Sequence, residues 1–244
     1  MAKTIHRVLT KGVFTVFFII PLVIIIQIPI FLLGATLGAY LSISNQLPEI
    51  PELVSYKPKT VSTFFSDDGS VIGIFYKQKR FVVDLDQIPQ NVINAFLAAE
   101  DSRFFQHDGV DYYGILRAIA RNIAAGRIAQ GGSTITMQVT RNFLLSRERT
   151  FSRKFKEMIL ASRLEKVWGK EKILYVYLNE IYLGEGCYGV EAAARGYFDK
   201  PVEHLTTAQA ALLAGLVASP ARFNPFKSEE LARQRQLTVL GRMQ

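Results

Sequence analysis

The sequence has a single cysteine, Cys187, among its 244 residues. An intrachain disulfide is therefore excluded, and so is a metal site built from several cysteine thiolates. The sequence also has no internal repeat and no low-complexity segment. We interpret the lone thiol as a buried structural side chain within one compact domain.

Charged residues are missing from a long stretch near the N-terminus, because no Asp, Glu, Lys or Arg occurs from Gly12 to Pro48. The apolar core of a signal peptide spans about 7–15 residues, whereas a helix that crosses a bilayer needs roughly 20. The length therefore predicts a transmembrane helix over residues 12–41, which Pro21 and Pro29 are expected to kink. An uncleaved export signal and a buried core helix are the alternatives. The proline-rich segment 42–60 is predicted to be an extended linker.

Acidic residues are absent from the first 48 positions, whereas Lys3, Arg7 and Lys11 precede the apolar run. The positive-inside rule then predicts that the tail, residues 1–11, is cytoplasmic and that the domain over residues 61–244 lies across the membrane. The net charge is +8, and residues 141–172 hold ten Lys or Arg against four Glu. Outside the cytoplasm such a segment favours phosphates or anionic lipid headgroups as partners, not nucleic acid.

The remaining pattern predicts a mainly α domain with a small β element. The runs VSTFFS and VIGIFY flank DDGS, which is typical of a hairpin, and RFVVDL follows as a third apolar run of the expected antiparallel ribbon. From Pro89 onward the apolar spacing is helical. Helices are expected from Pro89, from Asp111 as cap to Gly126, over 152–167, over KEKILYVYLNEIYL as a buried central helix, and after a capping box of Thr206 and Gln209.

Glu100 is an acid at the end of an apolar helical stripe formed by Val92, Ile93, Phe96 and Leu97. The helical period places Glu100 on the packed side and rotates the next residue away by about 100°. Partial burial raises the pKa of a carboxyl, which could then exchange a proton at neutral pH. The alternative is an ordinary ion pair with Arg103 three residues later.

Two further segments carry polar and cationic groups. RIAQGGSTITMQVTRN, residues 127–142, places hydroxyls, an amide and backbone N–H groups near an expected helix start, where phosphate binds readily. A glycine loop with a Ser or Thr cap is the alternative. In RERTFSRKFKEMILASRLEK, Glu157 follows Arg153 by four residues, so the choice lies between a solvated ion pair and a cationic cradle that contains a second carboxylate.

Four stretches together resemble a known family. AAEDSRFFQHDGVD, GGSTITMQ, RKFKE and KILYVYLNEIYLG are similar, in order and spacing, to four signatures of the peptidoglycan glycosyltransferases, or transglycosylases. The likeness is greatest to the glycosyltransferase portion of class A penicillin-binding proteins. Met137 departs from the pattern, because the family usually has glutamine there, and leaves Gln138 as the candidate amide. No Ser-x-x-Lys or Lys-Thr-Gly element occurs, so no transpeptidase site is predicted.

The resemblance implies a lysozyme-like helical fold that polymerises lipid II by inverting glycosyl transfer and releases undecaprenyl pyrophosphate. It implies Glu100 as general base and Glu157 as a second essential glutamate. His107 is expected to be a structural imidazole. The substrate-binding residues carried over are Asp101, Arg103, Ser133, Thr134, Gln138, Arg141, Arg149, Arg153 and Lys154.

The resemblance also implies the surroundings in which the domain would work. The partners would be lipid II, the growing glycan strand on its lipid pyrophosphate, the membrane and proteins of a cell-wall synthesis complex. The location would be the inner membrane with the catalytic domain outside the cytoplasm. No cofactor is required, although Mg²⁺ or Mn²⁺ could assist the pyrophosphate, and moenomycin would inhibit.

Two rival functions remain at this point. One is a lysozyme or lytic transglycosylase that cleaves finished glycan with a catalytic glutamate, although such a reaction needs no cradle for a diphosphate. The other is a membrane-anchored scaffold without catalysis, for which replacing Glu100 would change nothing.

Overall fold

The computed structural model describes residues 20–45, 47, 58, 60–127, 131–144 and 151–244. The chain divides into two units, Met1–Leu47 and Pro48–Gln244, and each is described by itself. The predicted cytoplasmic tail, the start of the apolar helix and most of the predicted linker lie outside the described residues.

The first unit contains one long apolar helix, α2, at Ile20–Ser44. Its stretch Ile25–Ser44 is, among the described residues, long and apolar enough to cross a membrane, with a mean hydropathy of 1.7. Its large side chains are exposed, and Phe31 reaches 75%. The helix continues through Pro29 and extends three residues beyond the predicted end at 41.

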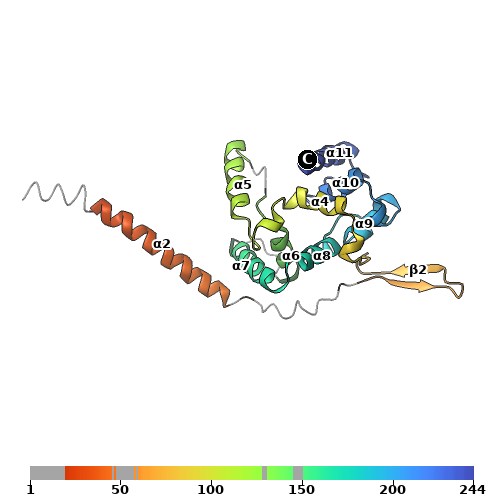
Figure 1. Cartoon of the computed structure of the whole chain (residues 1–244), viewed down its shortest axis with the longest axis horizontal. Helices are drawn as coiled ribbons and strands as arrows, with labels where there is room; N and C mark the ends of the chain where they lie inside the picture. The colour runs from red at the N-terminus through yellow and green to blue at the C-terminus, as the bar shows by residue number, and fades with distance from the viewer. Residues whose placement is uncertain (1–19, 46, 48–57, 59, 128–130, 145–150) are drawn as a thin grey trace, which may run out of the picture. The chain divides into compact units, whose positions relative to one another are not determined.

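The second unit begins with a two-stranded antiparallel hairpin, β1 (Ser62–Phe65) and β2 (Val71–Phe75), which projects from the helices in Figure 1. This confirms the predicted hairpin. The third apolar run, RFVVDL, is not a strand of this ribbon, which corrects the prediction. Its backbone instead bonds the Asn179 side chain, which accepts from the Val83 N–H and donates to the Val83 carbonyl, each at 3.0 Å.

Helices make up most of the second unit, so the predicted mainly α class is confirmed. The sequence signals correctly predicted α4, α5, α7, α8 and α10, whereas α9 and α11 were not predicted. Short 3₁₀ turns occur at Leu85–Gln87, Phe104–Gln106 and Val202–His204. The helices are α4 (Gln90–Glu100), α5 (Tyr112–Ala125), α6 (Ile135–Leu144), α7 (Phe151–Val167), α8 (Lys170–Glu180), α9 (Val190–Phe198), α10 (Thr207–Leu216) and α11 (Glu229–Met243).

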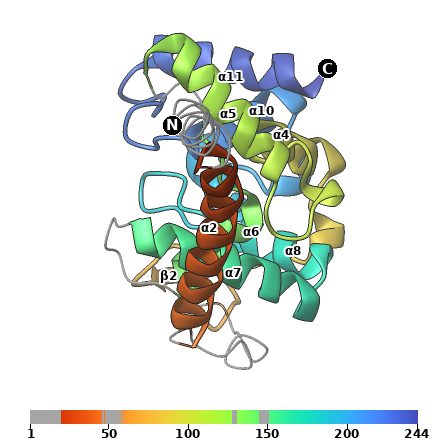
Figure 2. The same cartoon turned by 90° about the vertical axis from the view of Figure 1, so that its left-hand side faces the viewer.

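The helices of the second unit form two groups, which both views separate (Figures 1 and 2). In one group α4, α10 and α11 pack together, and in the other α6 packs on α7 and α8. A large core of buried side chains joins the two groups. Within it the rings of Phe96 on α4 and Tyr177 on α8 meet edge to face, with 6.4 Å between their centroids. The predicted central helix, α8, buries six of its residues.

One detail of the predicted helices is corrected. Asp111 occupies the N-cap of α5, but its side chain accepts no cap hydrogen bond and instead lies 3.7 Å from Arg103. The apolar residues of α5 are largely exposed, with Leu116 at 64% and Ile123 at 76%. The capping box of α10 is present, since the Thr206 hydroxyl accepts from the backbone N–H three residues on.

Candidate functional site

A cavity of about 590 Å³ lies where the end of α4 meets α5, the start of α6 and α11. Its floor and walls include the glycine pair before α6 and the turn after α10. Five arginines and three carboxylates line it, so charged side chains of both signs face the cavity. These residues are Glu100, Asp101, Asp111, Arg117, Arg121, Arg141, Arg235 and Arg242.

Glu100 is the last residue of α4 and faces this cavity. Burial raises the pKa of its carboxyl, because the charged form loses hydration. Gln138 opposes this effect by donating a hydrogen bond of 2.8 Å from its Nε2 to Glu100 Oε2, and three cavity arginines oppose it through their charge. A carboxylate held in this way can accept a proton and is oriented by its amide partner.

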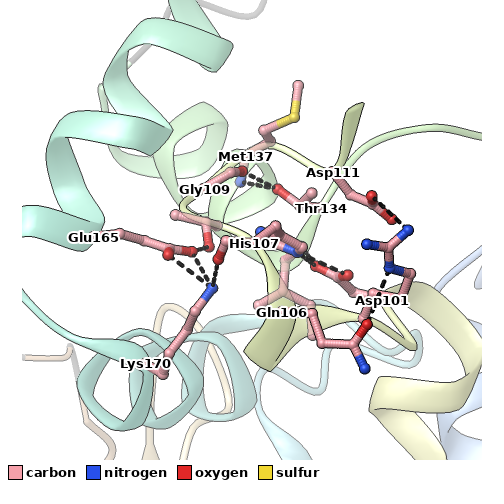
Figure 3. A network of polar contacts seen from close by, with 12 residues as sticks. Asp101, Gln106, His107, Gly109, Asp111, Thr134, Met137, Glu165 and Lys170 are labelled. Atoms are coloured by element: carbon pink, nitrogen blue, oxygen red, sulfur yellow. Dashed lines mark hydrogen bonds and ion pairs between the residues drawn. The ribbon is translucent and has the colours of Figure 1, made fainter. Parts of the chain in front are cut away.

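Asp101, the residue after Glu100, is more deeply buried than its neighbour, with 6% of its surface exposed. The helical period had placed it away from the packed side. The helix ends before it, however, and its backbone at φ −155° and ψ 72° turns the side chain inward. Its two carboxylate oxygens lie 3.1 Å from His107 Nε2, and one of them accepts the Ile135 N–H at 2.9 Å (Figure 3). Asp101 thus ties the end of α4 to the first residue of α6.

The start of α6 is fixed by further polar contacts. The Thr134 hydroxyl donates to the Gly109 carbonyl at 2.6 Å and accepts the Met137 N–H at 3.1 Å (Figure 3). Its hydrogen-bonding capacity is used within the protein, and it is 2% exposed. Thr134 therefore caps the start of α6, and it also lines the cavity. Its predicted contact with substrate stays a prediction.

A second ring of contacts anchors the far side of α6. Thr136 donates to Glu165 at 2.6 Å, and Lys170 Nζ bonds the same carboxylate at 2.7 Å (Figure 3). Lys170 also bonds the His107 carbonyl and lies over the Phe104 ring, 4.5 Å from its centroid. These contacts set the direction in which α6 presents Gln138 and Arg141 to the cavity.

Glu157 is 1% exposed and forms ion pairs with Arg153 and with Lys154, whose Nζ lies 2.8 Å from Glu157 Oε2. None of these three side chains lines the cavity. Lys154 is nevertheless connected to it, because its Nζ donates to Ser133 Oγ at 2.6 Å and Ser133 is a lining residue. Glu157, Arg153 and Lys154 thus form an ion-pair cluster that adjoins the cavity through the Ser133 hydroxyl. The role of this cluster as a substrate cradle stays a prediction.

Another predicted residue, Arg103, lies outside the cavity lining. Arg103 does not pair with Glu100; it contacts Asp111, bonds Gln106 and lies over the Tyr113 ring, outside the cavity lining. Arg149 falls outside the described residues. Arg141 lines the cavity, as the sequence interpretation required of a diphosphate ligand.

Four cavity arginines were missed by the sequence interpretation, because they lie outside the signatures. Arg117 and Arg121 are four residues apart on α5, and Arg235 and Arg242 are seven apart on α11. Both spacings put a pair on one face of a helix, so the spacing itself was the available signal.

The described residues do not offer an evident metal site. No group of three or more His, Cys, Asp or Glu suited to a metal ion occurs among them. Asp101 is occupied by His107 and the start of α6, and Asp111 faces Arg103.

Comparison with known proteins gives a consistent result over most of the chain. The Transglycosylase family model matches residues 68–244. The chain is 48% identical over 219 residues to penicillin-binding protein 1A of Aquifex aeolicus, covering 90% of this chain and 30% of that protein. It is 45% identical over 214 residues to penicillin-binding protein 1A of Neisseria lactamica, covering 88% of this chain and 27% of that protein.

Among solved structures, penicillin-binding protein 1A of Haemophilus influenzae matches with a TM-score of 0.43 and 27% identity, over 78% of this chain and 19% of that one. The chain spans less than a third of the length of these relatives.

Proposed function

Because this chain belongs to the transglycosylase family, we propose that its cavity polymerises lipid II into peptidoglycan glycan strands by inverting glycosyl transfer. The relatives named above are penicillin-binding proteins, which supports a role in peptidoglycan synthesis. The observation that carries the proposal is the position of Glu100, a carboxyl of raised pKa that faces five arginines across one cavity.

Glu100 is the general base in this proposal. It takes the proton from the 4-hydroxyl of the acceptor sugar, whose oxygen attacks the anomeric carbon of the donor from the face opposite the lipid diphosphate. A new glycosidic bond forms as the bond to the diphosphate breaks, and the configuration inverts from α to β. The burial of Glu100 suits this role, because a base with a pKa nearer neutrality retains the proton that it removes.

The leaving undecaprenyl pyrophosphate gathers negative charge as its bond breaks. Fixed cations stabilise such charge best where water is largely excluded. Arg117 and Arg121 on α5 and Arg141 on α6 are the cavity cations assigned to this role. Arg141 sits on the same helix as Gln138, so one element would position both the base and the leaving group.

The apolar helix α2 gives the proposal its setting. We assign it as a single transmembrane anchor in the inner membrane, with the N-terminus cytoplasmic and the domain outside. Tethering would confine the enzyme to the surface that holds its lipid-linked substrates and raise their effective concentration. A chain that lacks residues 1–44 should polymerise membrane-embedded lipid II more slowly, and equal rates would rule out this role for the anchor.

The direct test is a lipid II polymerisation assay in liposomes, with glycan products separated by length. The wild type should form polymer that moenomycin suppresses, and Glu100→Gln should reduce the rate by about 10²–10⁴-fold, the usual contribution of a general base. The exposed residue Glu230 provides a matched control, and Glu230→Gln should leave the rate unchanged. A Glu100→Gln variant with the wild-type rate would refute the mechanism.

The same protein preparations separate the rival functions. Incubation with finished peptidoglycan should release no soluble fragments if the cavity polymerises, whereas a lytic enzyme would release them. Full activity in cells carrying Glu100→Gln would favour a scaffold. The predicted assistance by Mg²⁺ or Mn²⁺ stays a prediction, which EDTA treatment during the assay would test.

A further inference from the structure

The helix α11 contributes two arginines to the lining of the cavity. Arg235 and Arg242 are separated by seven residues, which is about two helical turns, so they share one face of α11. That helix packs on α4, the helix that ends in Glu100. Neither arginine lies in the four signatures on which the sequence interpretation depended.

Arg242 is attached to the end of α4 by a direct contact. Its Nη1 donates a hydrogen bond of 2.9 Å to the carbonyl of Ala99, the residue before Glu100. The last four carbonyls of a helix have no partner within the helix, and its C-terminus carries a partial negative charge. A guanidinium there satisfies one of these carbonyls and stabilises the turn from which the Glu100 side chain extends.

Arg235 approaches the same region through the packing of α11 on α10. Its stem passes close to Gly215, where an added Cβ would lie 3.0 Å from Arg235 Cγ. No ion pair to Arg235 occurs among the described residues, and its buried Nε has no hydrogen-bond partner there. The guanidinium lies over the Phe223 ring, with its Cζ 5.8 Å from the ring centroid. Burial of a cation without an ion-pair partner is costly. The charge of Glu100, which lines the same cavity, opposes this cost by favouring the charged form of Arg235.

We propose that Arg235 and Arg242 are positioning residues that hold the end of α4 in place and favour the ionised form of the Glu100 carboxyl. The catalytic consequence rests on the proposed function above. The effect on the carboxyl group does not, because it rests on the packing of α11 against α4 and on the two arginine charges that line the cavity together with Glu100.

The charges that face Glu100 come from every element around it. α4 is followed by Asp101, α5 contributes Arg117 and Arg121 to the same cavity, and α6 contributes Arg141 and the Gln138 amide. Tyr177 of α8 interacts with Glu100 electrostatically. Burial raises the Glu100 pKa, and the Gln138 hydrogen bond, Arg235, Arg242 and Arg141 pull that pKa down, in that order. Loss of either α11 cation should therefore raise it further.

The first test measures the carboxyl itself and needs no enzymatic activity. The full chain in nanodiscs would carry ¹³C-labelled glutamate, with Glu100→Gln used to assign the resonance of Glu100. Arg235→Gln and Arg242→Gln should each move the Glu100 titration midpoint to higher pH, and the double variant should move it furthest. Arg233 is exposed on the same helix and outside the cavity lining, so Arg233→Gln should leave the midpoint unchanged.

The second test asks whether catalysis follows. The acid limb of kcat/KM against pH should move upward with the NMR midpoint in each variant. If the acid limb of a variant lies one pH unit higher than that of the wild type, its kcat/KM at a fixed pH well below the midpoint should be about tenfold lower. Arg235→Lys retains the charge and should restore most of the wild-type profile. A merely structural role would lower the rate at all pH values and leave the limb in place.

The outcomes are distinguishable. An unmoved Glu100 midpoint in the folded double variant overturns the inference. A shifted midpoint with an unmoved acid limb in an active enzyme instead refutes Glu100 as the base in the proposed function. If the midpoint shifts but the wild type makes no polymer, the electrostatic part stands and the proposed function fails. Thermal unfolding of each variant identifies any that does not fold. For such a variant, Arg235→Lys and Arg242→Lys replace the glutamine changes. Because lysine retains the charge, the Glu100 titration midpoint of these variants must stay near that of the wild type.

Discussion

Gln138 on α6 donates a hydrogen bond of 2.8 Å from its amide nitrogen to the Glu100 carboxylate at the end of α4. The preceding residue on α6, Met137, is fully buried on the other side of that helix, against Val110 and Ala161. The two neighbours therefore have different roles, because Gln138 orients the Glu100 carboxylate and Met137 fills a small apolar cluster. Where the family usually has glutamine, Met137 does not reach the cavity.

This division predicts different results for two conservative changes. Gln138→Leu removes the hydrogen bond to the ionised form of Glu100, so the pKa of Glu100 should rise and the acid limb of the polymerisation profile should move to higher pH. Met137→Leu keeps apolar volume in the cluster and should change stability by less than about 1.5 kcal/mol with no shift of the limb. A pH–rate profile of both variants checks the prediction, and identical shifts would contradict it.

Glu100 should also make the folded state less stable than it would be without the charge. Its pKa is raised in the folded protein, so between the unfolded and folded values the native state binds more protons than the unfolded state. Its contribution to stability therefore falls as pH rises through that window. Glu100→Gln keeps a carbonyl that can accept from Gln138 and should raise the free energy of unfolding at pH 7. Urea unfolding at pH 7 and at pH 4 checks this, because the gain should shrink at the lower pH.

An unchanged or larger difference at pH 4 would contradict this sign. The exposed change Glu230→Gln serves as control, since a solvated carboxylate should contribute little at either pH.

The sequence predicted those elements whose signals are local. Apolar spacing and caps identified α4, α5 and α10, and the Asp-Gly turn identified the hairpin. RFVVDL was expected in the ribbon because its apolar pattern is that of a strand. What holds it is the Asn179 side chain, almost a hundred residues later, and no local pattern indicates such a contact.

The candidate site was predicted in part for the same reason. Glu100 and Gln138 follow from the stripe and the glycine-rich segment, but their contact depends on how α4 meets α6. Asp101 was expected to point away because the helix was assumed to continue, whereas the chain leaves the helix at that residue. The spacing of Arg235 and Arg242 places them on one face of a helix, but it does not show that this face lines the cavity, which depends on how α11 packs on α4.

Glu157 offers a test of what the buried ion-pair cluster contributes to stability. Its carboxylate is 1% exposed and forms ion pairs with both Arg153 and Lys154. Removing one partner of a buried pair typically costs about 3–5 kcal/mol, so Glu157→Gln should lower the free energy of unfolding by about that much. Lys154→Met should cost less, because the lysine side chain is 40% exposed and Arg153 remains to pair with Glu157. Urea unfolding of both variants checks the order, and the reverse order would contradict the role assigned to Glu157.

Gly109 lies at a position where the backbone of α7 leaves no room for a side chain. Its φ is +90°, and an added Cβ would lie 2.6 Å from the backbone carbon and oxygen of Ala161 on α7. Gly109→Ala should therefore cost about 2–4 kcal/mol, from left-handed strain and overpacking together. Gly126, at the end of α5, has φ +62° and nothing within 4 Å of its added Cβ, so Gly126→Ala should cost only about 1 kcal/mol. Midpoints of urea unfolding distinguish the two, and equal losses would show that the close approach to α7 is not the cause.

The same pair should separate in activity as well. The Gly109 carbonyl accepts the hydroxyl of Thr134, which caps α6, and α6 presents Gln138 to Glu100. Displacing that carbonyl should loosen the start of α6, so folded Gly109→Ala should polymerise more slowly and show a raised Glu100 midpoint by NMR. Gly126→Ala makes no such contact and should retain the wild-type rate and midpoint. If Gly109→Ala is destabilised but keeps the wild-type midpoint, the path from this turn through Thr134 to the base is not the one that orients Glu100.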